Sequence, residues 1–399
     1  MHRPLHSARQ EYPANSRLAT GLCSALHIVL IVLGTGCAIP DFEMSETWFA
    51  GDLHVHTSIG SNDTDGLGSV SLLAETMDAR GLDFVFVTDH SNSAGSMHCE
   101  DVEDCPNLGP EFPARDEIEA LGLTGSRIWV GSEISPSAQT EPNGHVGCLP
   151  MGTDDFDAWE EAFIDRPVGA VTGAQALEQC QSIGGFAIVN HPDAPATWIR
   201  WDETADTYDG LEIYNGGGRF AYWDATTIET RWFADLRAGR KVVGVGGSDV
   251  HRFGVEPPGD FTNPALGYPT TWVAADDLED VPAALAAGRV IVGEPGSWVN
   301  LRAWRAGAET VGVGETLSGG RGVTWLRIEA NVGAPDLRLQ ILEVVTGELL
   351  VDRAPVAGST VAAEVEANAG IYVARLWPDT EDIDVLTGGV AITNPIWVE

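Results

Sequence analysis

The chain is short of positive charge. Its 399 residues contain 22 Lys and Arg against 59 Asp and Glu, which gives a formal net charge of −37, and Lys241 is the single lysine. A surface this acidic repels nucleic acids and anionic lipid headgroups. The sequence also has no stripe of basic residues, so it predicts no nucleic-acid partner.

The signatures of several enzyme classes are missing as well. The sequence has no GxSxG elbow for a serine nucleophile, no GxxxxGK[ST] phosphate loop and no nicotinamide or flavin fingerprint. The three glycines at 216–218 do not have the order of a phosphate loop. These absences give no support to a serine hydrolase, a phosphate-loop enzyme or a dinucleotide-dependent enzyme.

Histidine is scarce, and it is unevenly distributed. Three of the ten histidines lie in the first thirty residues, and the last hundred residues have none. His98 is one of the remaining seven, and the other six end or directly follow apolar runs. Those six are His54, His56, His90, His145, His191 and His251. Because apolar runs predict buried strands, these imidazoles are expected where strands pass into loops.

The stretch GDLHVHT at Gly51–Thr57 places two of these histidines two residues apart. Residues at this spacing on a strand point to the same side, so His54 and His56 can bind one metal ion. Such a pair also arises by chance. The spacing returns as Asp249 and His251 in SDVH, and Glu133 ends another apolar run. Imidazoles and carboxylates suit Zn, Mn or Fe, and a set this large exceeds the needs of one ion.

These motifs together resemble the PHP domain, named for polymerase and histidinol phosphatase. The resemblance rests on HxH, the DG of Asp65-Gly66, TDH, a strand end with Glu, two single histidines and the closing SDVH. GLDFVFVTDH, GLEIYNG, GGSDVHR, AAGRV and TNPIWV resemble its CehA/McbA branch, named after carbaryl-hydrolysing enzymes. The resemblance covers residue 48 to residue 399. It implies a distorted (β/α)7 TIM-like barrel and two or three divalent transition metal ions.

The resemblance also implies which residues bind each ion. One ion would be held by His54, His56, Glu133 and Asp249, and Glu133 would bridge to a second ion held by His145 and His191. Asp65, His90 and His251 would surround a third position. Phosphatase members have His in place of Asp65, and the nearby Asp63 is an alternative ligand, so the third position is left open.

The predicted chemistry is hydrolysis by a metal-bound hydroxide, with Glu133, Asp249 and Arg252 as catalytic residues. Arg252 is included because it directly follows His251. The predicted substrate is a small ester, carbamate or amide; the first alternative is a phosphoesterase that uses the same cluster. The second is a non-catalytic exported protein with structural metals. Four further polar residues beside the ligands are predicted to orient imidazoles or contact substrate, or to be ordinary turn residues: Asp52, Asp89, Glu212 and Asn215.

Apolar runs and helical spacers alternate along the first two thirds of the chain. Seven strands are predicted, at 48–57, 82–88, 127–133, 145–151, 185–190, 210–214 and 241–246, and helices at 69–80, 156–163, 173–182 and 226–238. The segment 278–292 is predicted to add one more helix and strand. Strand–helix repetition of this kind predicts an α/β fold, here a barrel over 48–296. The alternating run at 323–332 and the β-rich stretches after it predict a small antiparallel β-sandwich over 297–399, structural or carbohydrate-binding.

The first 36 residues have the pattern of an export signal. Arg3, Arg9 and Arg17 precede an apolar run at 22–33, and small residues lead to Cys37. The chain is therefore expected to be exported as a bacterial lipoprotein anchored through Cys37, with 37–47 as a linker; the alternative is ordinary secretion.

Four further cysteines follow the signal, and export permits disulfides. Cys99 and Cys105 are the preferred pair because they flank a short polar loop. Cys148 and Cys180 are either bonded or small buried residues. The oligomeric state does not follow from the sequence.

Overall fold

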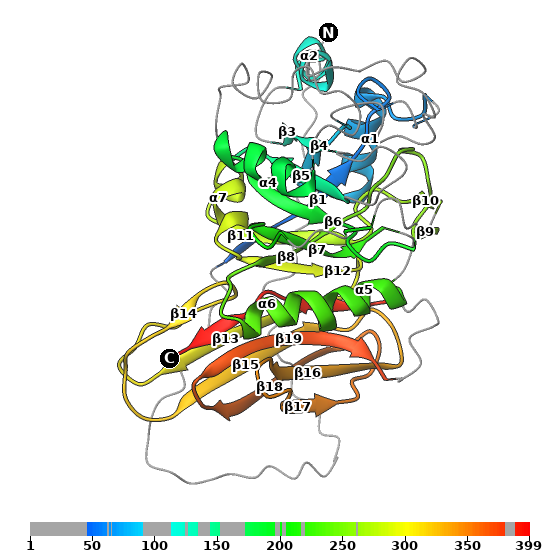
Figure 1. The fold of residues 1–399 in the computed structure, drawn as a ribbon. Helices are drawn as coiled ribbons and strands as arrows, with labels where there is room; N and C mark the ends of the chain where they lie inside the picture. Colours follow the sequence, from blue (N-terminus) through cyan, green and yellow to red (C-terminus); the bar gives the residue numbers. More distant parts are fainter. Residues whose placement is uncertain are drawn as a thin grey trace. The chain divides into compact units, whose positions relative to one another are not determined.

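The protein is described from a computed structural model. The structure describes residues 46–61, 64, 66–90, 113–123, 127–134, 144–151, 172–195, 200–201, 205–216, 220–260, 262–379 and 388–399. Residues 46–399 form one compact unit, whose helices and strands are labelled in Figure 1. The predicted signal with Cys37, Asp65 with its alternative Asp63, the Cys99–Cys105 pair and the helix at 156–163 lie outside the described residues.

Strands and helices alternate through the first half of the unit. In chain order they are β1 (Thr47–Val55), α1 (Val70–Arg80), β2 (Phe84–Val87), α2 (Pro113–Ala120), β3 (Ile128–Val130), β4 (Ser132–Ile134), β5 (His145–Leu149), α4 (Gly173–Ser182), β6 (Phe186–Asn190), β7 (Gly210–Asn215), α5 (Tyr222–Thr226), the π-helix η2 (Thr227–Trp232), α6 (Phe233–Arg237) and β8 (Val243–Gly247). The predicted mixed α/β class is confirmed.

Helix α1 shows how closely local sequence sets an element. Ser69 caps its first turn by accepting a hydrogen bond from the Leu72 N–H, and Gly81 ends it in the left-handed conformation with φ 67°. Val70, Leu73 and Met77 are its buried residues. The helix predicted over 69–80 therefore has the expected caps and the expected apolar face.

The strands of this half belong to two sheets. β1, β2 and β3 are parallel neighbours, and β4–β5–β6–β7–β8 form a second sheet in which β4–β5 and β5–β6 are antiparallel. Among the described residues, isolated bridges at Val55–Val250 and His90–Glu133 link the two sheets. The predicted closed, parallel barrel is therefore not confirmed. One physical reason is Asp249, whose φ of 57° ends the extended backbone of β8 beside β1.

The second half is mostly antiparallel. It contains β9 (Gly259–Asp260), β10 (Asn263–Pro264), β11 (Thr270–Ala275), the 3₁₀ turn η3 (Leu278–Asp280), α7 (Val281–Ala286), β12 (Val290–Gly293), β13 (Trp298–Arg305), β14 (Thr316–Leu317), β15 (Thr324–Asn331), β16 (Leu337–Glu343), β17 (Leu349–Arg353), β18 (Thr360–Ala367), β19 (Gly370–Pro378), β20 (Ala391–Thr393) and β21 (Ile396–Val398). β13, β15 and β18 form one sheet that packs on β19 and β20. Buried and half-buried residues alternate along β15, as the sequence predicts.

One large sheet runs through both halves. Its strand order is β14–β21–β19–β20–β12–β11–β1–β2–β3, with β16 and β17 attached at β19. The pairing of β12 with β20 crosses the domain boundary predicted at 296/297, which stays a prediction. Asn394, just after β20, accepts a hydrogen bond from the Gly244 N–H at 2.8 Å and donates one to the Gly244 carbonyl at 2.7 Å. It thereby joins β8 to the large sheet.

The helix predicted over 226–238 is a continuous run of three helical segments, α5, η2 and α6. It packs against the strands of the second half: Arg375 on β19 pairs with Glu229 at 2.8 Å, and Arg237 donates to the Val344 carbonyl at 2.8 Å. Among the described residues, no helix is both long enough and apolar enough to cross a membrane.

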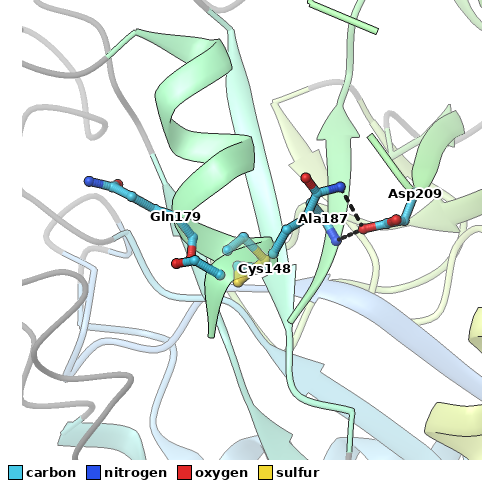
Figure 2. Close-up of a disulfide and its surroundings, with 7 residues drawn as sticks. Cys148, Gln179, Ala187 and Asp209 are labelled. Carbon is cyan, nitrogen blue, oxygen red and sulfur yellow. Dashed lines mark hydrogen bonds between the residues drawn. A yellow bond between two sulfur atoms is a disulfide. The ribbon is translucent and has the colours of Figure 1, made fainter. Parts of the chain in front are cut away.

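A disulfide ties α4 to β5. The sequence left Cys148 and Cys180 either bonded or free, and the structure bonds them, with both residues fully buried. Figure 2 shows this bond beside Ala187 on β6, whose N–H donates to the Asp209 carboxylate at 3.0 Å. A Cβ at Gly185 would lie 2.7 Å from both sulfur atoms, so the site requires glycine.

The disulfide is expected to stabilise the fold substantially. It closes a loop of 32 residues, and cross-links of this span raise the free energy of unfolding by about 3–4 kcal/mol by restricting the unfolded chain. Cys148→Ala with Cys180→Ala should lower that free energy by about this amount in urea titrations of metal-free protein. Wild-type protein under reducing conditions is the control, and an unchanged midpoint in both would contradict the expectation.

Candidate metal centre

The carboxylate of Glu133 on β4 lies at the centre of a histidine cluster. Its side chain is 1% exposed, and its oxygen atoms lie 3.0–3.2 Å from a ring nitrogen of each of four histidines. These four are His54, His90, His145 and His191. The Asn190 side chain also donates to Glu133, at 3.0 Å. The structure thus assembles residues that are up to 137 positions apart in the sequence.

Asp249 brings together the remaining predicted ligands. Its Oδ1 lies 3.3 Å from His54 Nε2 and 3.2 Å from His56 Nε2, and it is the second residue after β8. The His251 ring stacks on the His56 ring with centroids 4.1 Å apart, and the His90 ring lies 4.4 Å from His56. Every predicted ligand except Asp65, which is outside the described residues, is therefore in one cluster.

Three groups of side chains within the cluster have the spacing of metal sites. In each group the ligand atoms lie within 4.8 Å of one another. The groups are His54–Glu133–His191, His54–His56–Asp249 and His56–His90–His251. Because His54 and His56 each belong to two groups, the positions are adjacent, as in a polynuclear centre. Their roles as ligands stay predictions.

Two buried nitrogen atoms test whether the cluster fits a metal. The Nε2 atoms of His54 and His56 face Asp249 but have no hydrogen-bond partner among the described residues. Leaving a buried polar atom unsatisfied is costly. A divalent transition metal ion accepts the lone pair of such a nitrogen beside carboxylate oxygens, so the donor set fits.

Electrostatics keeps both carboxylates ionised. Burial acts to raise the pKa of Glu133, but His145 and His54 outweigh it and hold the pKa well below its usual range. Burial likewise opposes ionisation of Asp249, yet the nearby imidazoles of His54 and His56 lower its pKa. The buried charge of Glu133 and the partly buried charge of Asp249 make the centre attractive to cations.

The histidines differ in the direction of their pKa shifts. Burial, together with the nearby rings of His251 and His90, lowers the pKa of His56 to about 3, so this imidazole is in its neutral, metal-binding form. Burial also acts to lower the pKa of His54, but Asp249 and Glu133 raise it overall. The negative charges that favour a proton on His54 also favour a metal ion at this position.

Two aspartates beside the ligands have different roles. Asp89 accepts a hydrogen bond from the Ser61 hydroxyl at 2.9 Å, and that hydroxyl lies 3.1 Å from His56 Nδ1. Asp89 thus orients an imidazole through Ser61, a residue that sequence reasoning missed because no local pattern marks a contact set by a loop. Asp52 accepts instead from the backbone N–H groups of His54, Ser248 and Gly267. It joins backbone segments and contacts no imidazole.

Residues on η2 form hydrogen bonds that hold the turn containing His191. His191 has a φ of 27°, in the left-handed region that disfavours side chains. Asp193, two residues later, accepts two hydrogen bonds from Arg231 at 2.8 and 2.9 Å and one from Thr227 at 3.0 Å. Both partners lie on the π-helix, a conformation that is frequent near functional sites.

The sequence also has arginines at 200 and 219 in the loops that follow predicted strands, where ion pairing within the protein is expected, and the two described loop arginines, Arg200 and Arg252, have protein partners. Arg252 donates from Nη1 to Asn263 on β10 at 2.5 Å, and Arg200 donates to the Ala194 carbonyl at 3.2–3.3 Å. The catalytic role of Arg252 therefore stays a prediction. Arg219 lies outside the described residues.

Gly247 gives a test of the geometry. A Cβ there would lie 2.4 Å from His54 Cβ and 2.6 Å from Glu212 Oε1. Gly247→Ala should displace His54, weaken metal binding about tenfold and lower stability by about 1–3 kcal/mol. The control is Gly254→Ala, where the added Cβ meets nothing within 4 Å. Equal metal affinities in the two variants, measured by chelator competition, would reject the assigned packing.

No family model and no curated protein sequence matches the chain. Among solved structures, one from Bacteroides vulgatus is described as a two-domain protein containing a predicted PHP-like metal-dependent phosphoesterase. It is 17% identical, with a TM-score of 0.41 over 88% of this chain and 95% of the other. Another, from Bifidobacterium adolescentis and assigned as a metal-dependent phosphoesterase, is 17% identical. Its TM-score is 0.34 over 58% of this chain and 95% of the other.

Proposed function

We propose that the chain is a metal-dependent hydrolase of the PHP type. The observation that carries the proposal is the buried cluster in which six imidazoles surround Glu133 and Asp249. A purely structural site would be expected to have four ligands around one ion, whereas here three overlapping ligand groups share members. Such overlap is what adjacent ions that act on one substrate require.

Glu133 and Asp249 have different roles at the proposed centre. Divalent ions at such a centre lower the pKa of a water molecule and polarise the oxygen of the scissile group. Glu133 would be a central ligand, because its Oε1 lies beside His54, His145 and His191 and its Oε2 lies beside His90. Asp249 would complete the position shared by His54 and His56.

The strand order supports a distorted barrel around this centre. β1, β2 and β3 lead through Gly131 into β4, and β4 to β8 follow in sequence order. β8 returns to β1, where the His56 N–H donates to the Val250 carbonyl at 2.9 Å and the Asp249 N–H donates to the His54 carbonyl at 2.8 Å. With β3 and β4 counted as one strand interrupted at Gly131, we propose that these strands correspond to the seven strands of a (β/α)7 barrel, with isolated bridges in place of full ladders.

We propose an ester, carbamate or amide as the substrate. Phosphate monoesters carry about two negative charges and usually meet Arg or Lys beside the metals. The chain is strongly acidic, and Arg200 and Arg252 donate to protein carbonyl groups. Arg252 is also the reason to keep a phosphoester as the alternative, because it adjoins His251 at the site.

Metal content tests the centre itself. Purified protein should carry at least two equivalents of transition metal, and His54→Ala with His56→Ala should remove one equivalent and nearly all turnover, because both histidines belong to the ligand group with Asp249. His98→Ala is the control, since His98 is the one histidine after the first thirty residues that the sequence does not predict as a ligand. Full metal content in the double variant would refute the centre. Wild-type protein with full metal content but no turnover of any ester or phosphoester would favour the non-catalytic alternative.

Relative rates test the substrate class. We expect kcat/KM for an aryl ester or carbamate to exceed that for the matching aryl phosphate, and the same comparison is made in Arg252→Ala. A phosphate preference of tenfold or more that disappears in Arg252→Ala would make the phosphoesterase alternative correct.

We further propose that the protein is exported and anchored through a lipid on Cys37. The buried Cys148–Cys180 disulfide supports an oxidising compartment. Mass spectrometry of the mature N-terminus should find a diacylglyceryl group on Cys37. An unmodified terminus at another residue would indicate ordinary secretion instead.

A further inference from the structure

Glu212 on β7 is a buried carboxylate that belongs to none of the three ligand groups formed by the described residues. Its side chain is nonetheless in contact with two of the predicted ligands. The sequence left it as a residue that orients an imidazole, contacts substrate or has no special role. The contacts of its two oxygen atoms decide among these.

The first oxygen sets the state of His54. Glu212 Oε1 lies 3.1 Å from His54 Nδ1. Because a carboxylate oxygen accepts, the hydrogen belongs on Nδ1, and the lone pair of Nε2 then points toward Glu133 and Asp249. His54 Nε2 lies 3.2 Å from Glu133 Oε1 and 3.3 Å from Asp249 Oδ1. Glu212 therefore presents the nitrogen that two ligand groups share.

The second oxygen holds His191. Glu212 Oε2 accepts the His191 backbone N–H at 2.7 Å and the Asn215 side-chain N–H at 3.0 Å. His191 has the left-handed φ of 27°, a conformation that persists only when its surroundings enforce it. With both oxygens engaged inside the protein, Glu212 is not placed to bind substrate.

We propose that Glu212 is a positioning residue shared by two metal positions, one that fixes the tautomer of His54 and the turn of His191 together. This inference rests on the proposed metal-dependent function. It predicts that loss of the carboxylate weakens two metal equivalents at once, although Glu212 itself binds neither.

Glu212→Gln is the sharpest test because the amide has nearly the same shape. An amide offers one accepting oxygen and one donating NH₂ group, whereas the site needs two acceptors. If the NH₂ group faces His54, it favours the tautomer with hydrogen on Nε2, where metal should bind. If it faces His191, it leaves the backbone N–H without an acceptor.

The matched control is Glu294→Gln. Glu294 is also buried, and it accepts hydrogen bonds from the Tyr214 hydroxyl at 2.7 Å and the Gly389 N–H at 2.7 Å. Its hydrogen-bond partners among the described residues include no imidazole of the centre. This variant shows what the loss of a buried carboxylate does to the fold alone.

The experiment measures Zn²⁺ affinity by chelator competition and the visible spectrum of Co²⁺-loaded protein. In Glu212→Gln, we expect both equivalents to bind about 10- to 100-fold more weakly, with an altered Co²⁺ spectrum. In Glu294→Gln, affinity and spectrum should match wild type, even if the thermal midpoint of the metal-free protein falls. If Glu212→Gln does not fold, Glu212→Asp, which retains the charge on a shorter side chain, should show the same losses.

Unchanged affinity and spectrum in the Glu212 variant would overturn the inference, and so would a loss confined to one equivalent. Failure of the proposed function has a different signature, because wild-type protein would then bind no stoichiometric Zn²⁺ at all.

Discussion

The centre depends on the burial of two negative charges. Glu133 is almost fully buried and Asp249 lies beside it, and taking carboxylates out of water costs several kcal/mol each unless partners compensate. The surrounding imidazoles are those partners in the protein alone, and metal ions would be stronger ones. The arrangement of strands follows from this requirement, since only the ends of several different strands can bring six rings to one point.

Backbone conformations at the centre are correspondingly unusual. His191 and Asp249 are two of the three described residues other than glycine with a positive φ. Such conformations cost about 1–3 kcal/mol each and persist where the surroundings enforce them. Glu212 and the Asp193–Arg231 pair supply that enforcement for His191. The fold thus tolerates strained backbone at His191 and Asp249, which orients these predicted ligands, as is common at functional sites.

The sequence was most informative where local patterns decide the structure. Strand-end histidines and the caps of α1 follow from short-range spacing, so they were predictable. The Cys148–Cys180 pair was not, because connectivity among four cysteines cannot be read from the chain. Neither was the pairing of β12 with β20 nor the contact of Ser61 with His56. Both depend on which distant segments of the chain come into contact. The antiparallel order of β4, β5 and β6 was not predicted either, because the alternation of strands and helices indicates a parallel sheet.

The hydrogen bonds between Asn394 and Gly244 bear on when the protein folds. A ribosome makes the chain in order, so β8, which leads to Asp249, is synthesised about 150 residues before its partner Asn394. Likewise, β12 is synthesised about 100 residues before its partner β20. The histidine cluster therefore cannot reach its final sheet environment during synthesis of the first 390 residues. Residues 391–394, which carry no predicted ligand, therefore complete the sheet beside the strand that leads to Asp249.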